Sequence, residues 1–156
     1  PAKIFALTQK GREFFEASYD EIALSALHFM EQKFGREAIR DFAKLRIESV
    51  FNDFSKPVKN LSNLVQEMSD HGFSASERPA PFPNAQQLCQ HNCPIAHVAE
   101  QHPEFCEAEL DAFSELLGVN VTRLSTIANG GNICTSLVST LPKTAVSSAS
   151  QHKEKK

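Results

Sequence analysis

The stretch that decides the fold is NCPIAHVAEQHPEFCEAELDAFSELLG, residues 92–118, which continues as VNVTRLSTIANGGNICTSLV over residues 119–138. It carries Cys93, Cys106 and Cys134 in the spacing C-x12-C and then C-x27-C. No two of these are close enough for the CxxC signature of zinc knuckles or ferredoxins. Each lies at the boundary of an expected structural element, so we expect folding to bring the three sulfurs to a shared metal or cluster site.

The elements around these cysteines can be placed from proline, glycine and apolar periodicity. We expect helices over 94–101 and 103–117, the second ended by Gly118, and strands over 119–127 and 133–138 joined by the hairpin turn Asn129-Gly130-Gly131-Asn132. On the first strand, Val119, Val121 and Arg123 alternate with Asn120, Thr122 and Leu124. The result is a small α+β unit.

The residues before this unit are mostly helical by the same criteria. Helices are expected over 9–18, 20–34, 36–54 and 58–71, strands over 73–76 and 85–91, and a proline-rich loop over ERPAPFPN, residues 77–84. On the 20–34 helix, the 3.6-residue period of an apolar face is fitted by Ile22, Ala23, Ala26, Leu27, Met30 and Phe34. The 36–54 helix is apolar over more than one face, which indicates that other elements pack against it on both sides. We expect a second subunit to provide one of these packing surfaces.

Composition limits the class of protein. The 156 residues suit one domain, the net charge of −3 does not favour nucleic-acid binding by the chain as a whole, and no apolar run approaches the roughly 20 residues of a membrane span. No signal peptide is visible, so we expect a cytoplasmic protein with reduced thiols. Nucleophile elbows, phosphate loops and HExxH motifs are absent from the sequence, and we expect no enzyme activity.

The positions of the cysteines suggest ligand chemistry. Cys93 precedes Pro94 at an expected helix start, and Cys106 lies in the first turn after Pro103, where the helix dipole favours thiolate, the metal-binding form. Cys134 follows the hairpin turn. An inert buried thiol is the alternative for each cysteine taken alone.

Other candidate ligands lie near these cysteines. Cys89 is expected to be a bystander, and the Cys93-Pro94 pair also occurs in haem-regulatory sites. A histidine could complete a Cys3His zinc site, and a carboxylate could complete a coordination shell. The simpler expectation is that the histidines are exposed and that the acids form a solvated helix face: His91, His97, His102, Glu104, Glu107, Glu109 and Asp111.

The segment 92–118 with VTRLSTIANGGNICTSLV resembles the C-terminal sensing domain of SufR-type iron–sulfur repressors, in the NC dipeptide, the C-x12-C gap and the third cysteine after a glycine-containing hairpin. The start, PAKIFALTQKGREFF, resembles the wing and following helix of winged helix-turn-helix regulators, and residues 18–48 resemble the family's linker and dimerisation helices. After Cys134 the chain reads TSLV, where relatives often carry an aromatic residue.

The resemblance implies an α+β fold, with long dimerisation helices before a small antiparallel sheet with two helices, and a winged-helix remnant at the start. Its regions would be the end of a wing and helix at 1–19, a helical linker and dimerisation region at 20–71, and the cysteine-containing sensor at 72–140. The remaining residues, 141–156, are mostly small and polar and basic at the end, so we expect a disordered tail.

The resemblance also implies a function. The chain would be part of a homodimeric transcriptional repressor of cluster-assembly genes that holds a [4Fe–4S] cluster on Cys93, Cys106 and Cys134. Operator DNA would be bound through an N-terminal helix-turn-helix largely outside this chain. The alternatives are a zinc-, haem- or thiol-redox-sensing regulator of similar architecture, and a dimerisation or interaction module that senses nothing.

Overall fold

The computed structural model describes residues 19–142. The helix predicted over 9–18, most of the wing remnant and almost all of the tail lie outside this range. The elements are α2 (Tyr19–Phe34), α3 (Arg36–Asn52), α4 (Leu61–Asp70), β1 (Ala75–Pro79), β2 (Ala85–Gln90), α5 (Ala96–Gln101), α6 (Glu104–Leu117), β3 (Val119–Ser125) and β4 (Cys134–Pro142). Within residues 19–142, none of the helices has the length and apolar character needed to cross a membrane.

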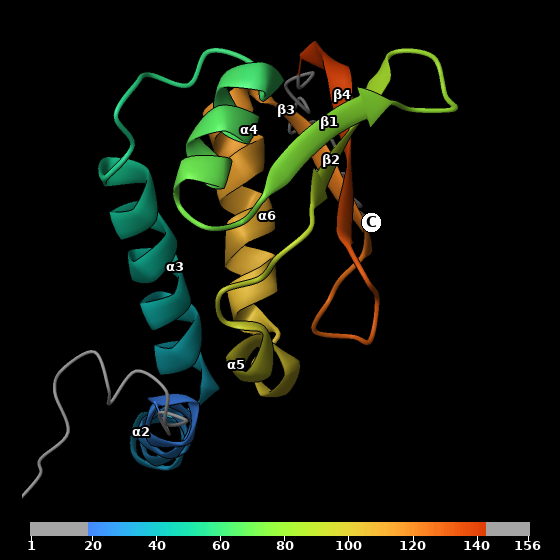
Figure 1. The fold of residues 1–156 in the computed structure, drawn as a ribbon. Helices are drawn as coiled ribbons and strands as arrows, with labels where there is room; N and C mark the ends of the chain where they lie inside the picture. The colour runs from blue at the N-terminus through green and yellow to red at the C-terminus, as the bar shows by residue number, and fades with distance from the viewer. Residues whose placement is uncertain (1–18, 143–156) are drawn as a thin grey trace, which may run out of the picture.

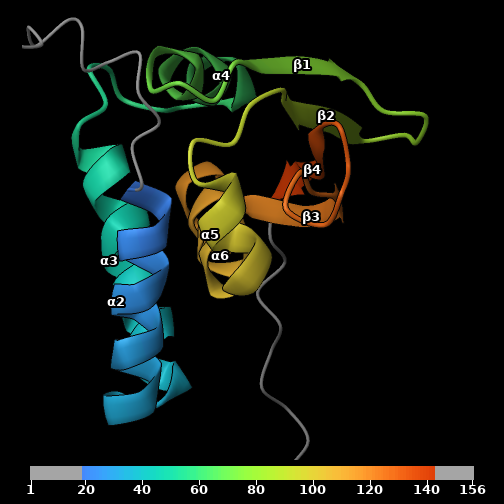
Figure 2. The same cartoon turned by 60° about the horizontal axis from the view of Figure 1, so that its bottom comes forward.

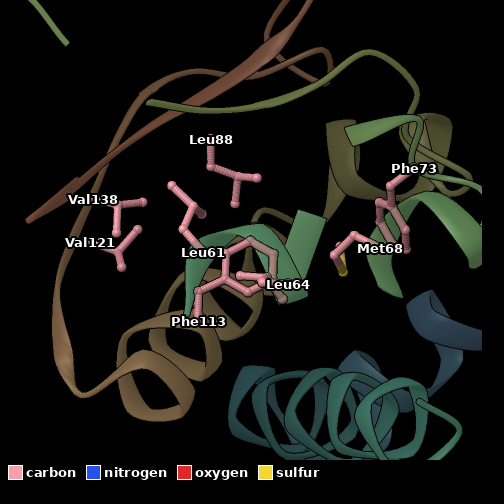
Figure 3. Close-up of a cluster of buried hydrophobic side chains, with 8 residues drawn as sticks. All are labelled: Leu61, Leu64, Met68, Phe73, Leu88, Phe113, Val121 and Val138. Carbon is pink, nitrogen blue, oxygen red and sulfur yellow. The ribbon is translucent and has the colours of Figure 1, made fainter. Parts of the chain in front are cut away.

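The sheet confirms the predicted α+β class. Its four antiparallel strands run in the order β1-β2-β4-β3, and α4 and α6 pack against one of its faces (Figure 1). The core between these layers joins side chains from both helices, three strands and the loop between α4 and β1 (Figure 3): Leu61, Leu64, Met68, Phe73, Leu88, Phe113, Val121 and Val138. Apolar burial of this kind is the main favourable term for such a small unit.

Helix α3 joins the N-terminal helices to the α+β unit by packing along α6 (Figure 1). Its Ile39, Ala43 and Ile47 are buried. At one end, Arg36 forms an ion pair with the buried Glu104 at the start of α6. Helix α2 packs against α3 (Figure 2). The α+β unit therefore contacts α3 along α6, and it also contacts α2 directly through α5, where His97 bonds Asp20.

The apolar face predicted for α2 is only partly covered within the chain: Leu27, Ala23 and Met30 pack in a core with α3 and α5. Leu27 is buried, but Ile22 and Phe34 are 68% and 71% exposed. On α3, Phe42 and Leu45 are also exposed, at 40% and 64%. Exposed side chains of this size gathered on neighbouring helices are typical of an interaction surface.

Several boundaries differ from the predictions. Strand β4 continues to Pro142 rather than residue 138, so Leu141 and Pro142 belong to the sheet and not to the predicted disordered tail. Two other differences have local reasons. Helix α4 begins at Leu61 rather than residue 58, because Asn60 caps it by accepting the N–H of Asn63 at 2.9 Å. Strand β1 continues through Pro79 into the segment predicted as loop, since it is an edge strand and Pro79 stands at its end, where a missing N–H costs little.

Candidate metal centre

The three predicted cysteines line one pocket. Cys93 comes from the loop between β2 and α5, Cys106 from the third position of α6, and Cys134 from the first position of β4. Helix α3 forms another wall of the pocket with Ala43, Arg46 and Ile47. Apolar side chains of neighbouring segments complete the lining. Residues 93, 106 and 134, far apart in the chain, thus meet where the sheet, α6 and α3 converge.

The register of the sheet explains why Cys134 faces this pocket. Cys134 pairs with Gln90 across β2 and β4, and paired residues share a face of the sheet. Gln90 lines the pocket, and so does Cys134. Cys89 precedes Gln90 on β2 and therefore faces the other side. It is buried but outside the lining, which agrees with its predicted bystander role.

The thiol pKa values run opposite to the sequence-based expectation. Burial, followed by the Glu109 carboxylate, raises the pKa of Cys106 to about 11. Burial also raises the pKa values of Cys93 and Cys134 above the usual range. Cys106 does lie in the first turn of α6, but Cys93 lies outside α5, whose first residue is Ala96. Without a cation, the three side chains are therefore neutral thiols near pH 7.

Several groups are nevertheless placed to stabilise negative charge on sulfur. The Ile127 backbone N–H donates a hydrogen bond to Cys134 Sγ at 3.2 Å. The Ile95 N–H bonds to the Cys93 sulfur and opposes the effect of burial on its pKa. The Arg123 guanidinium likewise lowers the thiol pKa of Cys106 and Cys134. Hydrogen bonds to sulfur of this type tune metal–thiolate sites.

A polar network closes one side of the pocket. Arg123 donates to Glu109 Oε2 at 2.6 Å and to Gln90 Oε1 at 3.0 Å. Gln90 Nε2 donates to Glu109 Oε1 at 3.1 Å, which completes a triangle between β3, α6 and β2. The Arg123 and Glu109 side chains are only 13% and 14% exposed. Glu109 and Gln90 line the pocket, so this network forms part of its polar surface.

The acidic residues of α6 do not all lie on a solvated face, as the simpler prediction had it. Glu107 and Asp111 are exposed. Glu104 is buried against Arg36, however, and Glu109 is held inside the pocket by Arg123. One carboxylate of the predicted set therefore lies beside the thiols.

The histidines proposed for a zinc site are not drawn to the pocket. His97 is exposed and bonds Asp20 at 2.7 Å, with Nδ1 facing the carboxylate. His91 contacts the Ser76 hydroxyl, and His102 is buried outside the pocket lining. Between Tyr19 and Pro142, no three His, Cys, Asp or Glu side chains are grouped closely enough to hold a single metal ion. A Cys3His zinc site therefore finds no ready ligand set in this part of the chain.

The size of the pocket bears on what it can hold. The cavity between the lining side chains is about 20 Å³, room for about one water molecule. A larger guest would need the side chains around it to move outward. Cys93 lies in a loop and Cys134 directly follows the turn between β3 and β4, and such connecting segments adjust more readily than a helix such as α6.

Sequence reasoning missed three polar residues of the site: Gln90, Arg123 and Arg46. Arg123 did carry a signal, because it follows Val119 and Val121 on the alternation that predicts the inward face of its strand. An arginine at an inward position requires a buried partner. The partner itself, Glu109, could be found only from the fold.

No protein-family model matches the chain, and no curated protein matches it.

Proposed function

We propose that this chain is the sensor and dimerisation part of an iron–sulfur cluster-responsive transcriptional repressor, with Cys93, Cys106 and Cys134 holding a [4Fe–4S] cluster. The observation that supports this most is the pocket shared by these three cysteines and by no other cysteine of the chain. The donor chemistry also fits, because cluster irons are bound by thiolates that accept hydrogen bonds from backbone N–H groups. When bound, the cluster would supply redox- and oxygen-sensitive chemistry.

The chain's own residues provide a way for the site to influence the helices. Arg46, Ile95 and Phe105 line both the cysteine pocket and a neighbouring apolar groove of about 250 Å³. This groove is otherwise lined by residues of α2, α3 and α5, including Leu27 and Phe42. Outward movement of the pocket walls would therefore reach the contact between α2 and α3. Free energy released when the thiols bind a shared guest stabilises the folded form of the unit.

The homodimer in this proposal is supported by the uncovered apolar face of α2 and α3. Tyr19, Ile22, Phe29 and Phe34 on α2 are exposed. Together with Phe42 and Leu45 on α3, they provide exposed apolar side chains on two neighbouring helices for a second copy to cover. A dimer is also what two-fold operator DNA requires, since half-sites about one DNA turn apart bind two recognition helices.

A thiol-redox sensor is less well supported than a cluster sensor. Reactive cysteines are thiolates in partly exposed, electropositive surroundings, whereas the three thiols here have raised pKa values because of burial. Such thiols react slowly with oxidants and bind metal only with loss of their protons.

Anaerobic purification of the full-length protein tests the proposal. Wild type should be brown, with about four iron and four sulfide per chain. Cys93→Ser should lose most of both, and Cys89→Ser, the matched control, should keep them. Operator binding by the wild type should fall when the cluster is lost in air. A colourless wild type that contains stoichiometric zinc, or no metal at all, would refute the cluster.

A further inference from the structure

The pocket contains three sulfur ligands, while the four irons of a cubane cluster require four. Besides the cysteines, its lining includes three polar side chains: Arg46, Gln90 and Glu109. Arginine cannot ligate a metal because its guanidinium has no free lone pair at accessible pH. The Gln90 carboxamide oxygen already accepts from Arg123 at 3.0 Å and is a neutral, weaker donor. Glu109 alone offers an anionic oxygen.

We propose that the Glu109 carboxylate is the fourth ligand of the cluster, which rests on the function proposed above. Glu109 lies three residues after Cys106 on α6, so both side chains project from the same face of the helix into the pocket. It interacts electrostatically with all three thiols, as its carboxylate contributes to raising the pKa of each.

The orientation of Glu109 is fixed in the way that metal-binding carboxylates usually require. Arg123 holds Oε2 and Gln90 holds Oε1, one hydrogen bond each. An ionised carboxylate has about four acceptor positions, so each oxygen keeps one free for a metal. Partners that hydrogen-bond a ligating carboxylate are a regular part of metal sites. Arg123 and Gln90 would serve as positioning residues.

Charge leads to the same conclusion. With the three cysteines as thiolates, the pocket would hold four negative groups, Glu109 included, against two guanidinium groups, from Arg46 on α3 and Arg123 on β3. An excess of negative charge in a largely buried site is unfavourable without a cation. A cationic guest that binds all four anionic groups removes that cost. A role limited to pairing with Arg123 would not require the Glu109 carboxylate to line the pocket of the thiols.

Three substitutions at Glu109 separate a ligand from a structural partner. Glu109→Gln keeps the hydrogen-bonding shape but removes the anionic ligand. Glu109→Cys supplies a thiolate ligand but cannot accept two hydrogen bonds as the carboxylate does. Glu109→Ala removes both. Glu107→Ala is the matched control, because Glu107 is an exposed acid on the same helix.

Each full-length variant is purified anaerobically beside wild type, and iron content, the EPR spectrum and the decay of visible absorbance in air are recorded. We expect Glu109→Gln and Glu109→Ala to lose the cluster about 10- to 100-fold faster, with a shift from four irons toward three. Glu109→Cys should retain four irons with an altered spectrum, and Glu107→Ala should match wild type. Circular dichroism of each variant without cluster checks its folding.

The opposite pattern would overturn the inference. If Glu109→Gln behaves like wild type while Glu109→Cys behaves like Glu109→Ala, the carboxylate acts only through Arg123. A wild type that binds four irons and is unaffected by all three substitutions likewise excludes Glu109 and leaves the cluster intact. A wild type without iron refutes the proposed function itself, and this ligand assignment with it.

Discussion

Removal of Arg123 from the protein without cluster should reveal how strongly the pocket depends on its ion pair with Glu109. Arg123→Met leaves the Glu109 carboxylate with only the Gln90 amide as a partner, in a position 14% exposed. Loss of one partner of a buried ion pair costs about 3 to 5 kcal/mol, and the residual exposure of both side chains places this pair near 3 kcal/mol. The free energy of unfolding should fall by that amount.

A double-mutant cycle isolates the interaction. Glu109→Gln leaves the Arg123 guanidinium two amide oxygens to bond, so its cost should be smaller, about 2 kcal/mol. In the double variant, the amides of residues 90 and 109 can bond each other, and the total cost should also be about 2 kcal/mol rather than the additive 5. The coupling energy is then about 3 kcal/mol. Urea unfolding followed by circular dichroism measures all four proteins.

The exposed pair of Arg40 and Glu37 provides the control. Its N–O distance, 2.7 Å, is close to that of the buried pair, but the two side chains are 47% and 69% exposed. Because solvent screens such pairs, a cycle on Arg40 and Glu37 should give a coupling indistinguishable from zero. If the Arg123–Glu109 coupling is below about 0.5 kcal/mol, the network does not organise the pocket as argued.

Three further outcomes follow from the same geometry. Burial raises the pKa of Cys106 from 9.0 to about 11, so between these pH values the folded cluster-free protein keeps a proton that the unfolded chain releases. Its free energy of unfolding, measured in urea, should therefore fall as pH rises from about 9 to about 11, and the fall should be shallower in Cys106→Ser. A Cβ on Gly131 would stand 2.7 Å from the Thr126 carbonyl oxygen, so Gly131→Ala should shift the hairpin before Cys134. Its free energy of unfolding in urea should fall by about 1 to 3 kcal/mol, and the iron content of the anaerobically purified variant should fall below that of wild type. Leu45→Glu should convert the proposed dimer to monomer in light scattering after gel filtration, whereas Leu124→Glu, also at an exposed leucine but on β3, should not; a dimer that survives Leu45→Glu would place the interface elsewhere.

The sequence was sufficient for the order and type of the elements because their signals are local. Apolar periodicity and the glycine after Leu117 place α6 within one residue, and Gly118 indeed adopts a left-handed φ of 66° at its end. Alternation and the Gly130-Gly131 turn predict the pairing of β3 with β4. The sequence also predicted that the three cysteines meet, because each lies at the end of an expected helix or strand, where its side chain can face a common site.

What could not be predicted depends on contacts between distant segments. Periodicity identifies the apolar face of α2 but not what covers it, and Ile22 and Phe34 are exposed in the single chain. The Arg123–Glu109 pair joins residues on different elements, and neither position identifies the other. Glu104, likewise, is buried only because Arg36 reaches it from α3.

The reversed direction of the thiol pKa values follows from comparing magnitudes. A helix N-terminus stabilises a nearby negative charge by about 0.3 to 1 kcal/mol, which is less than one pKa unit. Burial can raise the pKa of an acid by up to about 3 to 5 units, so at Cys106 burial outweighs the helix terminus. Such a pocket keeps its sulfurs protonated and unreactive until a metal displaces the protons. Metal binding at such a site becomes tighter as pH rises, and burial protects the empty site from the oxidants that the proposed cluster would sense.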